Sequence, residues 1–365
     1  YLTEKVNMQQ LAKDIAAIIA DYHCDYTGAK AFAMAPEHVL AWVQQFKEAD
    51  QQFILEEFLH LLRKGIYVNK VQAEALLWKR MQSLAARYKF ADVATFFANT
   101  VFLDLQPAGK SQSVLLQMLD GLMKKNVGHG LKDCGKISQK YVIYLDDVIE
   151  TGGTVFAHIL NWLKEDDAAG TTNLQQVLDN KKTIIVSSFC LHTWALLMQW
   201  RWKMELKNDP ISKKVVFLYD YEIQNHPSFP NQKFNFVYPC QPQPALVTNY
   251  FDGLTVSNKE EHAYRLANKP AAESFYSSPA NRIRFENILL QKGIELLNAA
   301  ATLKPNHRPL GMVSPSYKTF GTGTLFFTWR NISNTCPVVF WWKSADWKPL
   351  FPLHNRGLGN MPFGT

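Results

Sequence analysis

The stretch from Tyr141 to Thr154, Y-V-I-Y-L-D-D-V-I-E-T-G-G-T, constrains the fold of this chain more than any other. Its first part, Val142 to Leu145, is a short apolar run of β-branched and aromatic residues. Such a run predicts a strand that is buried on both faces of a mostly parallel sheet. Asp146 and Asp147 follow directly. We therefore expect two carboxylates at the carboxyl end of a parallel strand, where open α/β sheets bind their ligands.

A glycine turn comes shortly after the acidic pair. Thr151, Gly152, Gly153 and Thr154 lead into an apolar run at 155–160 whose spacing predicts a helix. Two glycines let the backbone aim several N–H groups at one point, and the start of the helix adds its positive dipole end. The pattern predicts a phosphate site beside carboxylates that suit sugar hydroxyls or a metal ion. An acidic pair and a glycine turn also suit the plain end of a core strand, and that alternative stays open.

The order of residue types in this stretch resembles the signature of the type I phosphoribosyltransferases, which bind 5-phosphoribosyl-1-pyrophosphate. The resemblance implies a doubly wound, mostly parallel α/β sheet. It implies that Asp146 and Asp147 contact the ribose hydroxyls, and that Thr151, Gly152, Gly153 and Thr154 hold the 5′-phosphate. It also implies a Mg²⁺ ion near the acidic pair, bridging pyrophosphate and sugar oxygens. The activity implied is transfer of the phosphoribosyl group to a nucleophilic nitrogen.

A second loop precedes the signature. Residues 106–112 contain Gly109, Lys110 and Ser111, and they lie between a predicted strand at 101–105 and a predicted helix at 114–119. Strand, glycine-containing loop and helix form an anion-binding geometry, to which Lys110 adds charge. By resemblance, Gly109 and Ser111 bind the pyrophosphate and Lys110 helps it leave. A P-loop nucleotidase is the rival interpretation, but a Walker A loop needs a glycine where Asp104 stands.

The segment between the two loops is short for an active transferase. The phosphoribosyltransferases usually place a mobile hairpin there, which closes over the reacting centre and excludes water. Residues 121–140 hold a short version of such a lid at most. The second hypothesis is therefore a non-catalytic module that senses a nucleotide or serves as a subunit of a larger complex.

The chain divides by pattern into three segments. Residues 1–94 look helical, residues 95–225 alternate strands and helices, and residues 226–365 form an aromatic-rich α+β extension, expected to pack on the core with strands between glycine and proline turns. Arg330 follows a G-x-G turn in this extension and is a candidate to reach the phosphoribosyl pyrophosphate. Taken together, these features resemble the phosphoribosyltransferase-like effectors of bacterial antiphage and conflict systems, some of which are linked to retrons.

The composition limits the kinds of ligand and partner that the chain is expected to bind. The net charge of +7 permits a phosphorylated sugar or nucleotide as ligand and permits nucleic acid, for instance through a defence-system partner protein. Five widely spaced cysteines, without a C-x-x-C pair, favour a reduced cytoplasm over secretion. The sequence contains no run of about 18 consecutive apolar residues, so we expect no transmembrane helix. The acceptor stays open among a base, a nucleotide, a nucleic acid and a protein side chain.

Overall fold

The computed structural model describes residues 2–28, 31–166, 170–226, 233–255 and 263–353. The chain forms two compact units. One unit combines Tyr1–Lys70 with Pro230–Asn355, and the other is Val71–Phe229. The sequence pattern divides the chain into three consecutive segments with boundaries at 94 and 225. The two compact units are a different kind of division, because one of them joins the first and last parts of the chain, and the three-segment division stays a prediction. Among the described residues, no helix has the length and apolar character needed to cross a bilayer.

Residues 71–229 form an α/β unit around a four-stranded sheet in the order β2-β3-β4-β5. All three strand pairs are parallel, so the predicted mostly parallel α/β fold is confirmed. Apolar runs rich in valine, isoleucine and aromatic residues form the strands because both faces of the sheet are covered. The strands are β2 (Thr100–Phe102), β3 (Tyr141–Ile149), β4 (Thr183–His192) and β5 (Val215–Ile223).

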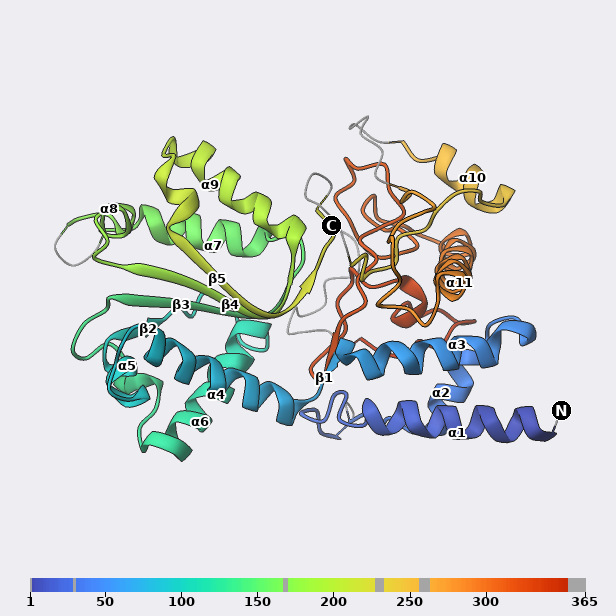
Figure 1. The fold of residues 1–365 in the computed structure, drawn as a ribbon, viewed down its shortest axis with the longest axis horizontal. Coiled ribbons are helices and arrows are strands. Elements are labelled where there is room, and N and C mark those ends of the chain that lie inside the picture. The colour runs from blue at the N-terminus through green and yellow to red at the C-terminus, as the bar shows by residue number, and fades with distance from the viewer. Residues whose placement is uncertain (1, 29–30, 167–169, 227–232, 256–262, 354–365) are drawn as a thin grey trace. The chain divides into compact units, whose positions relative to one another are not determined.

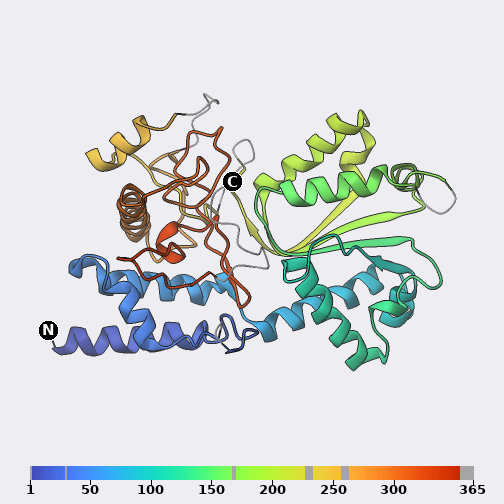
Figure 2. The ribbon, with the colours of Figure 1, turned by 180° about the vertical axis from the view of Figure 1, so that it is seen from behind.

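Helices cover both faces of this sheet (Figures 1 and 2). On one face, Tyr144 and Val186 of the sheet share a buried core with Ile159 and Trp202 from the helices. That face carries α7 (Gly153–Lys164), α8 (Asn173–Leu178) and α9 (Leu197–Leu206), and the other carries α4 (Lys70–Arg87), α5 (Val93–Ala98) and α6 (Ser111–Val127). Short 3₁₀ turns complete the unit at Leu131–Asp133, Thr193–Leu196 and Pro210–Lys213.

The other unit is helical and aromatic. Its elements are α1 (Leu2–Ile18), α2 (Pro36–Val43), α3 (Glu48–Leu61), a π-helical turn (Leu62–Ile66), β1 (Tyr67–Val68), α10 (Ala245–Asp252), α11 (Pro279–Asn298), β6 (Phe327–Thr328) and a 3₁₀ turn (Val338–Phe340). The first and last parts of the chain meet in its core. The Trp42 indole N–H donates to the Val339 carbonyl at 2.9 Å, and the Trp42 ring stacks on Phe340 at 5.5 Å.

The aromatic strands expected in the C-terminal segment are mostly absent. From 305 to 353, the described chain contains β6, which pairs with β1 in parallel, and otherwise turns and irregular backbone. The prediction of several strands there was wrong, because the aromatic side chains are buried from loops. Main-chain bonds tie those loops together, as from the Leu310 N–H to the Phe320 carbonyl at 2.8 Å.

Candidate functional site

The acidic pair lies inside β3. Parallel pairing continues past it, since Asp146 lies opposite Ser188 and Ile149 opposite Leu191. The strand predicted to end at Leu145 therefore ends four residues later, because the neighbouring strand supplies hydrogen-bond partners as far as Ile149. Both acidic residues are buried, each being 7% exposed.

The two carboxylates are held by local backbone bonds. Asp146 Oδ1 accepts from the Asp147 N–H and Asp147 Oδ1 accepts from the Val148 N–H, each at 2.9 Å. Burial, followed by the negative charge of Asp147, raises the pKa of Asp146 to about 8. An acidic pair kept at this cost in free energy is typical of a binding or catalytic site rather than of a core.

The predicted glycine turn is formed and precedes α7. Gly152 caps the helix with φ of 71°, in the left-handed region. This φ favours glycine, and a Cβ on Gly152 would lie 2.5 Å from Met198 Cε and 3.2 Å from the Ala195 carbonyl oxygen, so its neighbours would have to shift as well. Thr151, Gly153 and Thr154 are exposed.

The start of α7 has the features of an anion site. No side chain caps it in the described structure, and the first N–H groups of a helix have no partner within the helix. The exposed Thr151 and Thr154 of the turn add hydroxyl groups at the same place in the chain. A phosphate there would receive backbone and side-chain hydrogen bonds and the positive end of the helix dipole.

The loop at 106–112 reaches the acidic pair. Gln112 Oε1 accepts from the N–H groups of Leu105 and Gln106 at 2.6 and 3.1 Å, which fixes the backbone of the loop. Gln106 Nε2 lies 3.5 Å from Asp146 Oδ2, and the Ser111 hydroxyl donates to Gln106 Oε1 at 3.2 Å. The start of α6 and the acidic pair thus belong to one polar cluster.

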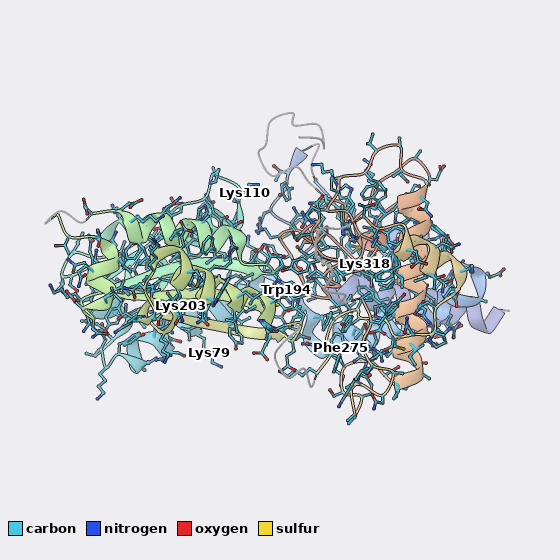
Figure 3. All side chains as sticks on the ribbon, turned by 90° about the horizontal axis from the view of Figure 1, so that it is seen from above. Lys79, Lys110, Trp194, Lys203, Phe275 and Lys318 are labelled. Carbon is cyan, nitrogen blue, oxygen red and sulfur yellow. The ribbon has the colours of Figure 1, made fainter. Side chains whose placement is uncertain are left out.

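The predicted pyrophosphate residues surround this helix start. Lys110 is the N-cap residue of α6 and is partly buried, and Ser111 is the first helical residue. Gly109 precedes them in an exposed turn with φ of 81°. Lys110 is labelled in Figure 3 at this end of the α/β unit. The structure therefore brings Ser111 and Asp146 together through Gln106, with Lys110 next along the chain.

A hydrogen-bonded chain connects the two loops. Gln106 Nε2 donates to the Tyr144 hydroxyl at 3.0 Å, and that hydroxyl lies 2.8 Å from His158 Nδ1 in α7. Burial lowers the pKa of His158, so its ring nitrogen is free to accept the Tyr144 proton. This contact fixes α7, and the turn before it, relative to the α6 loop.

Sequence reasoning missed two polar residues beside the acidic pair, Arg80 and Ser187. Arg80 of α4 donates to the Ser187 hydroxyl at 3.0 Å and pairs with Asp220 at 2.8 Å. All three line a hollow that also includes Asp146 and has about 10 Å³ of space, enough for one water molecule. Two signals pointed to them: Arg80 interrupts the apolar stripe of its helix, and Ser187 interrupts a buried strand.

The remaining predicted residue, Arg330, belongs to the other compact unit. It follows β6 and is 4% exposed. Its predicted contact with phosphoribosyl pyrophosphate stays a prediction.

A magnesium site would rest on two protein carboxylates. Within the described residues, no group of three or more histidine, cysteine, aspartate or glutamate side chains is arranged to hold a metal. Mg²⁺ commonly takes one or two carboxylates and completes its shell with water and substrate phosphates. The buried carboxyl groups of Asp146 and Asp147 fit that mode of binding.

Comparison with known proteins identifies a family. The family model PRTase-CE matches residues 39–353, which includes the α/β unit and most of the other unit. Neither the curated proteins nor the solved structures gave a significant match.

Proposed function

The chain belongs to the PRTase-CE family, a phosphoribosyltransferase-like family, and from this we propose that it binds 5-phosphoribosyl-1-pyrophosphate and transfers its phosphoribosyl group to a nitrogen nucleophile. The observation that carries the proposal is the buried pair Asp146 and Asp147 between the starts of α6 and α7. No side chain caps α7, and at α6 the Gln112 N–H donates to Gln106 Oε1 at 3.4 Å. An acidic pair suits ribose hydroxyls, and two helix starts suit the phosphate groups at the two ends of the substrate.

Each part of the site has a role in this proposal. The turn Thr151–Thr154 holds the 5′-phosphate through backbone N–H groups and hydroxyls. Asp146 and Asp147 accept hydrogen bonds from the ribose hydroxyls. Lys110 and Ser111, with the start of α6, hold the pyrophosphate and stabilise its charge as it departs.

The reaction breaks the bond between C1′ and the pyrophosphate oxygen, and pyrophosphate leaves with the electron pair. The acceptor nitrogen donates its lone pair to C1′ and then loses a proton. Asp146 and Asp147 would hold a Mg²⁺ ion that supplies charge neutralisation for pyrophosphate. The contribution of the protein is then mainly positioning and charge stabilisation of the oxocarbenium-like state.

Pyrophosphate release tests this proposal. The protein is incubated with phosphoribosyl pyrophosphate, Mg²⁺ and panels of bases, nucleotides, oligonucleotides and proteins. We expect release with at least one acceptor class, and loss of release in Asp146→Asn/Asp147→Asn. Asp179→Asn is the matched control, because its carboxylate is on the surface with Lys181 at 3.8 Å. Equal release by the natural protein and the acidic-pair variant would contradict the proposal.

A second candidate function is a nucleotide-sensing module without turnover. It is favoured by residues 121–140, which form the end of α6, a 3₁₀ turn and irregular backbone but no hairpin lid. Ligand binding without pyrophosphate release from any acceptor class would favour this candidate.

The proposed role as a toxic effector in antiphage defence rests on the sequence resemblance alone. Growth arrest on expression tests it. Arrest by the natural chain, but not by the Asp146→Asn/Asp147→Asn variant, is the expected result. Arrest by both would contradict it.

A further inference from the structure

Helix α9 presents apolar side chains on two opposite faces. Met198 and Trp202 point into the core of the α/β unit and are 1% and 0% exposed. Trp200 and Met204 lie on the opposite side and are 58% and 54% exposed. A tryptophan and a methionine one helical turn apart on a surface are informative, because large apolar side chains gathered in one exposed place indicate an interaction site.

The exposed face of α9 is also basic. Lys203 follows Trp200 by three positions, which places it on the same face, and Lys207 is the C-cap residue that ends the helix. Arg201 flanks that face, with its guanidinium 3.9 Å from the ring of Phe156. Lys203 is labelled in Figure 3, which looks onto this side of the unit. We call Trp200, Arg201, Lys203, Met204 and Lys207 the α9 platform.

The acidic groups near this helix leave most of that charge available. Glu205, within the helix, lies 3.6 Å from Lys164 of α7, and Asp209 lies 3.0 Å from Lys203. Asp209 is 78% exposed, so its pair with Lys203 is a solvent-screened surface pair that a polyanion can replace. The platform thus keeps a net positive charge around its aromatic ring.

We propose that the α9 platform binds single-stranded nucleic acid. Unpaired bases stack on an exposed aromatic ring, while lysine and arginine side chains contact the phosphates on either side. Tryptophan, methionine and arginine are enriched at protein interfaces, but lysine is depleted there, so the two lysines favour a polyanion over a protein partner. The net charge of +7 gives the chain as a whole the same preference for a polyanion.

The platform is distinct from the proposed transferase site and does not rest on it. None of its five residues belongs to the acidic pair, the glycine turn or the α6 loop. The buried side of the same helix nevertheless contacts the glycine turn, because Met198 packs against Gly152. A strand bound on the platform would therefore lie on the helix that supports the phosphate turn.

Fluorescence anisotropy with labelled oligonucleotides of about 20 nucleotides tests the proposal. The arms are oligo-dT, oligo-U and a DNA duplex, each titrated across a series of salt concentrations. We expect single strands to bind more tightly than the duplex, since stacking needs unpaired bases, and the comparison of dT with U tells DNA from RNA. Affinity should fall steeply as salt rises, because each phosphate contact releases counterions.

Variants separate stacking from charge. Trp200→Ala should weaken single-strand binding about ten-fold, and Trp200→Phe should retain most of it. Lys203→Glu should lower the slope of log affinity against log salt by about one or more. Lys79→Glu is the matched control, because it makes the same charge change at an exposed position of α4, on the other face of the sheet. It should leave oligonucleotide binding close to that of the natural protein.

Three outcomes would overturn the proposal. The first is no binding of single strands at low salt by the folded natural protein. The second is binding that Trp200→Ala leaves unchanged. The third is a Trp200→Ala variant whose only effect is a lower mass in solution, which would assign the platform to a second copy of the chain. The Asp146→Asn/Asp147→Asn variant should bind oligonucleotides normally, so failure of the transferase site and failure of the platform are distinguishable.

Discussion

Buried carboxylates occur in both units of the protein, but their surroundings differ. In the helical and aromatic unit, Glu286 of α11 is paired with Arg265 at 2.9 Å and Arg282 at 3.3 Å, and Glu273 is paired with Arg282 at 2.5 Å. In the α/β unit, the charged groups that act most strongly on Asp146 are Asp147 and Glu150, which are both acidic.

This difference distinguishes buried carboxylates with a structural role from those with a functional role. Buried charges whose partners are inside the protein fix the packing of the segments that carry them. Buried charges whose neighbours have the same sign are costly, and such groups gather where a ligand or cation will compensate them. The first arrangement ties α11 to the loops around it, and the second marks the candidate site.

Removal of an internal partner should have the largest effect on stability. Arg282→Met leaves Glu273 and Glu286 buried with fewer partners, so we expect it to lower the free energy of unfolding by about 3–5 kcal/mol. Arg284→Met is the control, two positions along the same helix, because Arg284 is 46% exposed in its pair with Asp50. It should cost at most about 1 kcal/mol. Thermal and urea unfolding measure both, and equal losses would contradict the structural role.

Glycine substitutions sharpen the same contrast. In the aromatic unit, Gly311 has φ of 104°, and a Cβ there would lie 2.0 Å from the Thr335 carbonyl oxygen. Gly311→Ala should therefore destabilise the protein by about 2–4 kcal/mol. In the α/β unit, a Cβ at Gly153 meets nothing closer than Thr151 Oγ1 at 3.8 Å.

Gly153→Ala should accordingly leave the unfolding midpoint nearly unchanged, within about 0.5 kcal/mol. It should nonetheless weaken ligand binding, because the added methyl group enters the proposed phosphate position. Unfolding and calorimetry on the same samples decide this. A stable Gly153→Ala variant with unaltered ligand affinity would remove the turn from the site.

The pH dependence of stability tests whether Asp146 is uncompensated. Its native pKa of about 8 lies above its unfolded value of 3.8, so the native state holds a proton that the unfolded state releases. Stability should therefore fall as pH rises from about 4 to about 8, and Asp146→Asn should reduce this fall. Burial also raises the pKa of Glu286, to about 7, and this residue contributes a fall of the same sign in both proteins.

The difference between the two proteins isolates the contribution of Asp146. We expect the variant to exceed the natural protein by about 1–3 kcal/mol at pH 9 relative to pH 4. Unfolding in urea across this pH range measures the difference. Parallel curves for the two proteins would show that Asp146 is compensated and would weaken its assignment to the site.

The parts of the α/β unit encoded in short contiguous patterns were predictable. The apolar run at 142–145, the turn Thr151–Thr154 and the loop around Lys110 each determine a local structure, and parallel pairing brings those structures to one region. The end of β3 was not predictable, because pairing with β4 sets it. Nor was Arg80, whose partners Ser187 and Asp220 are more than a hundred residues away in the sequence.

The structure of the C-terminal aromatic segment could not be predicted from the sequence, for a different physical reason. Aromatic residues that alternate with turn residues predict short strands when only the local sequence is considered. In this unit the aromatic residues belong to loops, and their rings are nevertheless buried in the core. Trp42 and Phe340, nearly three hundred residues apart, stack in that core. Contacts of such long range are set by the whole unit, and periodicity does not encode them.

Calorimetry with 5-phosphoribosyl-1-pyrophosphate and Mg²⁺ tests the central claim most directly. The natural protein is compared with Asp146→Asn/Asp147→Asn, and a thermal unfolding curve shows that each is folded. We predict saturable binding by the natural protein and none by the variant. Absence of binding by the folded natural protein, or equal binding by both proteins, would contradict the claim that the buried acidic pair is the sugar-binding part of a phosphoribosyl pyrophosphate site.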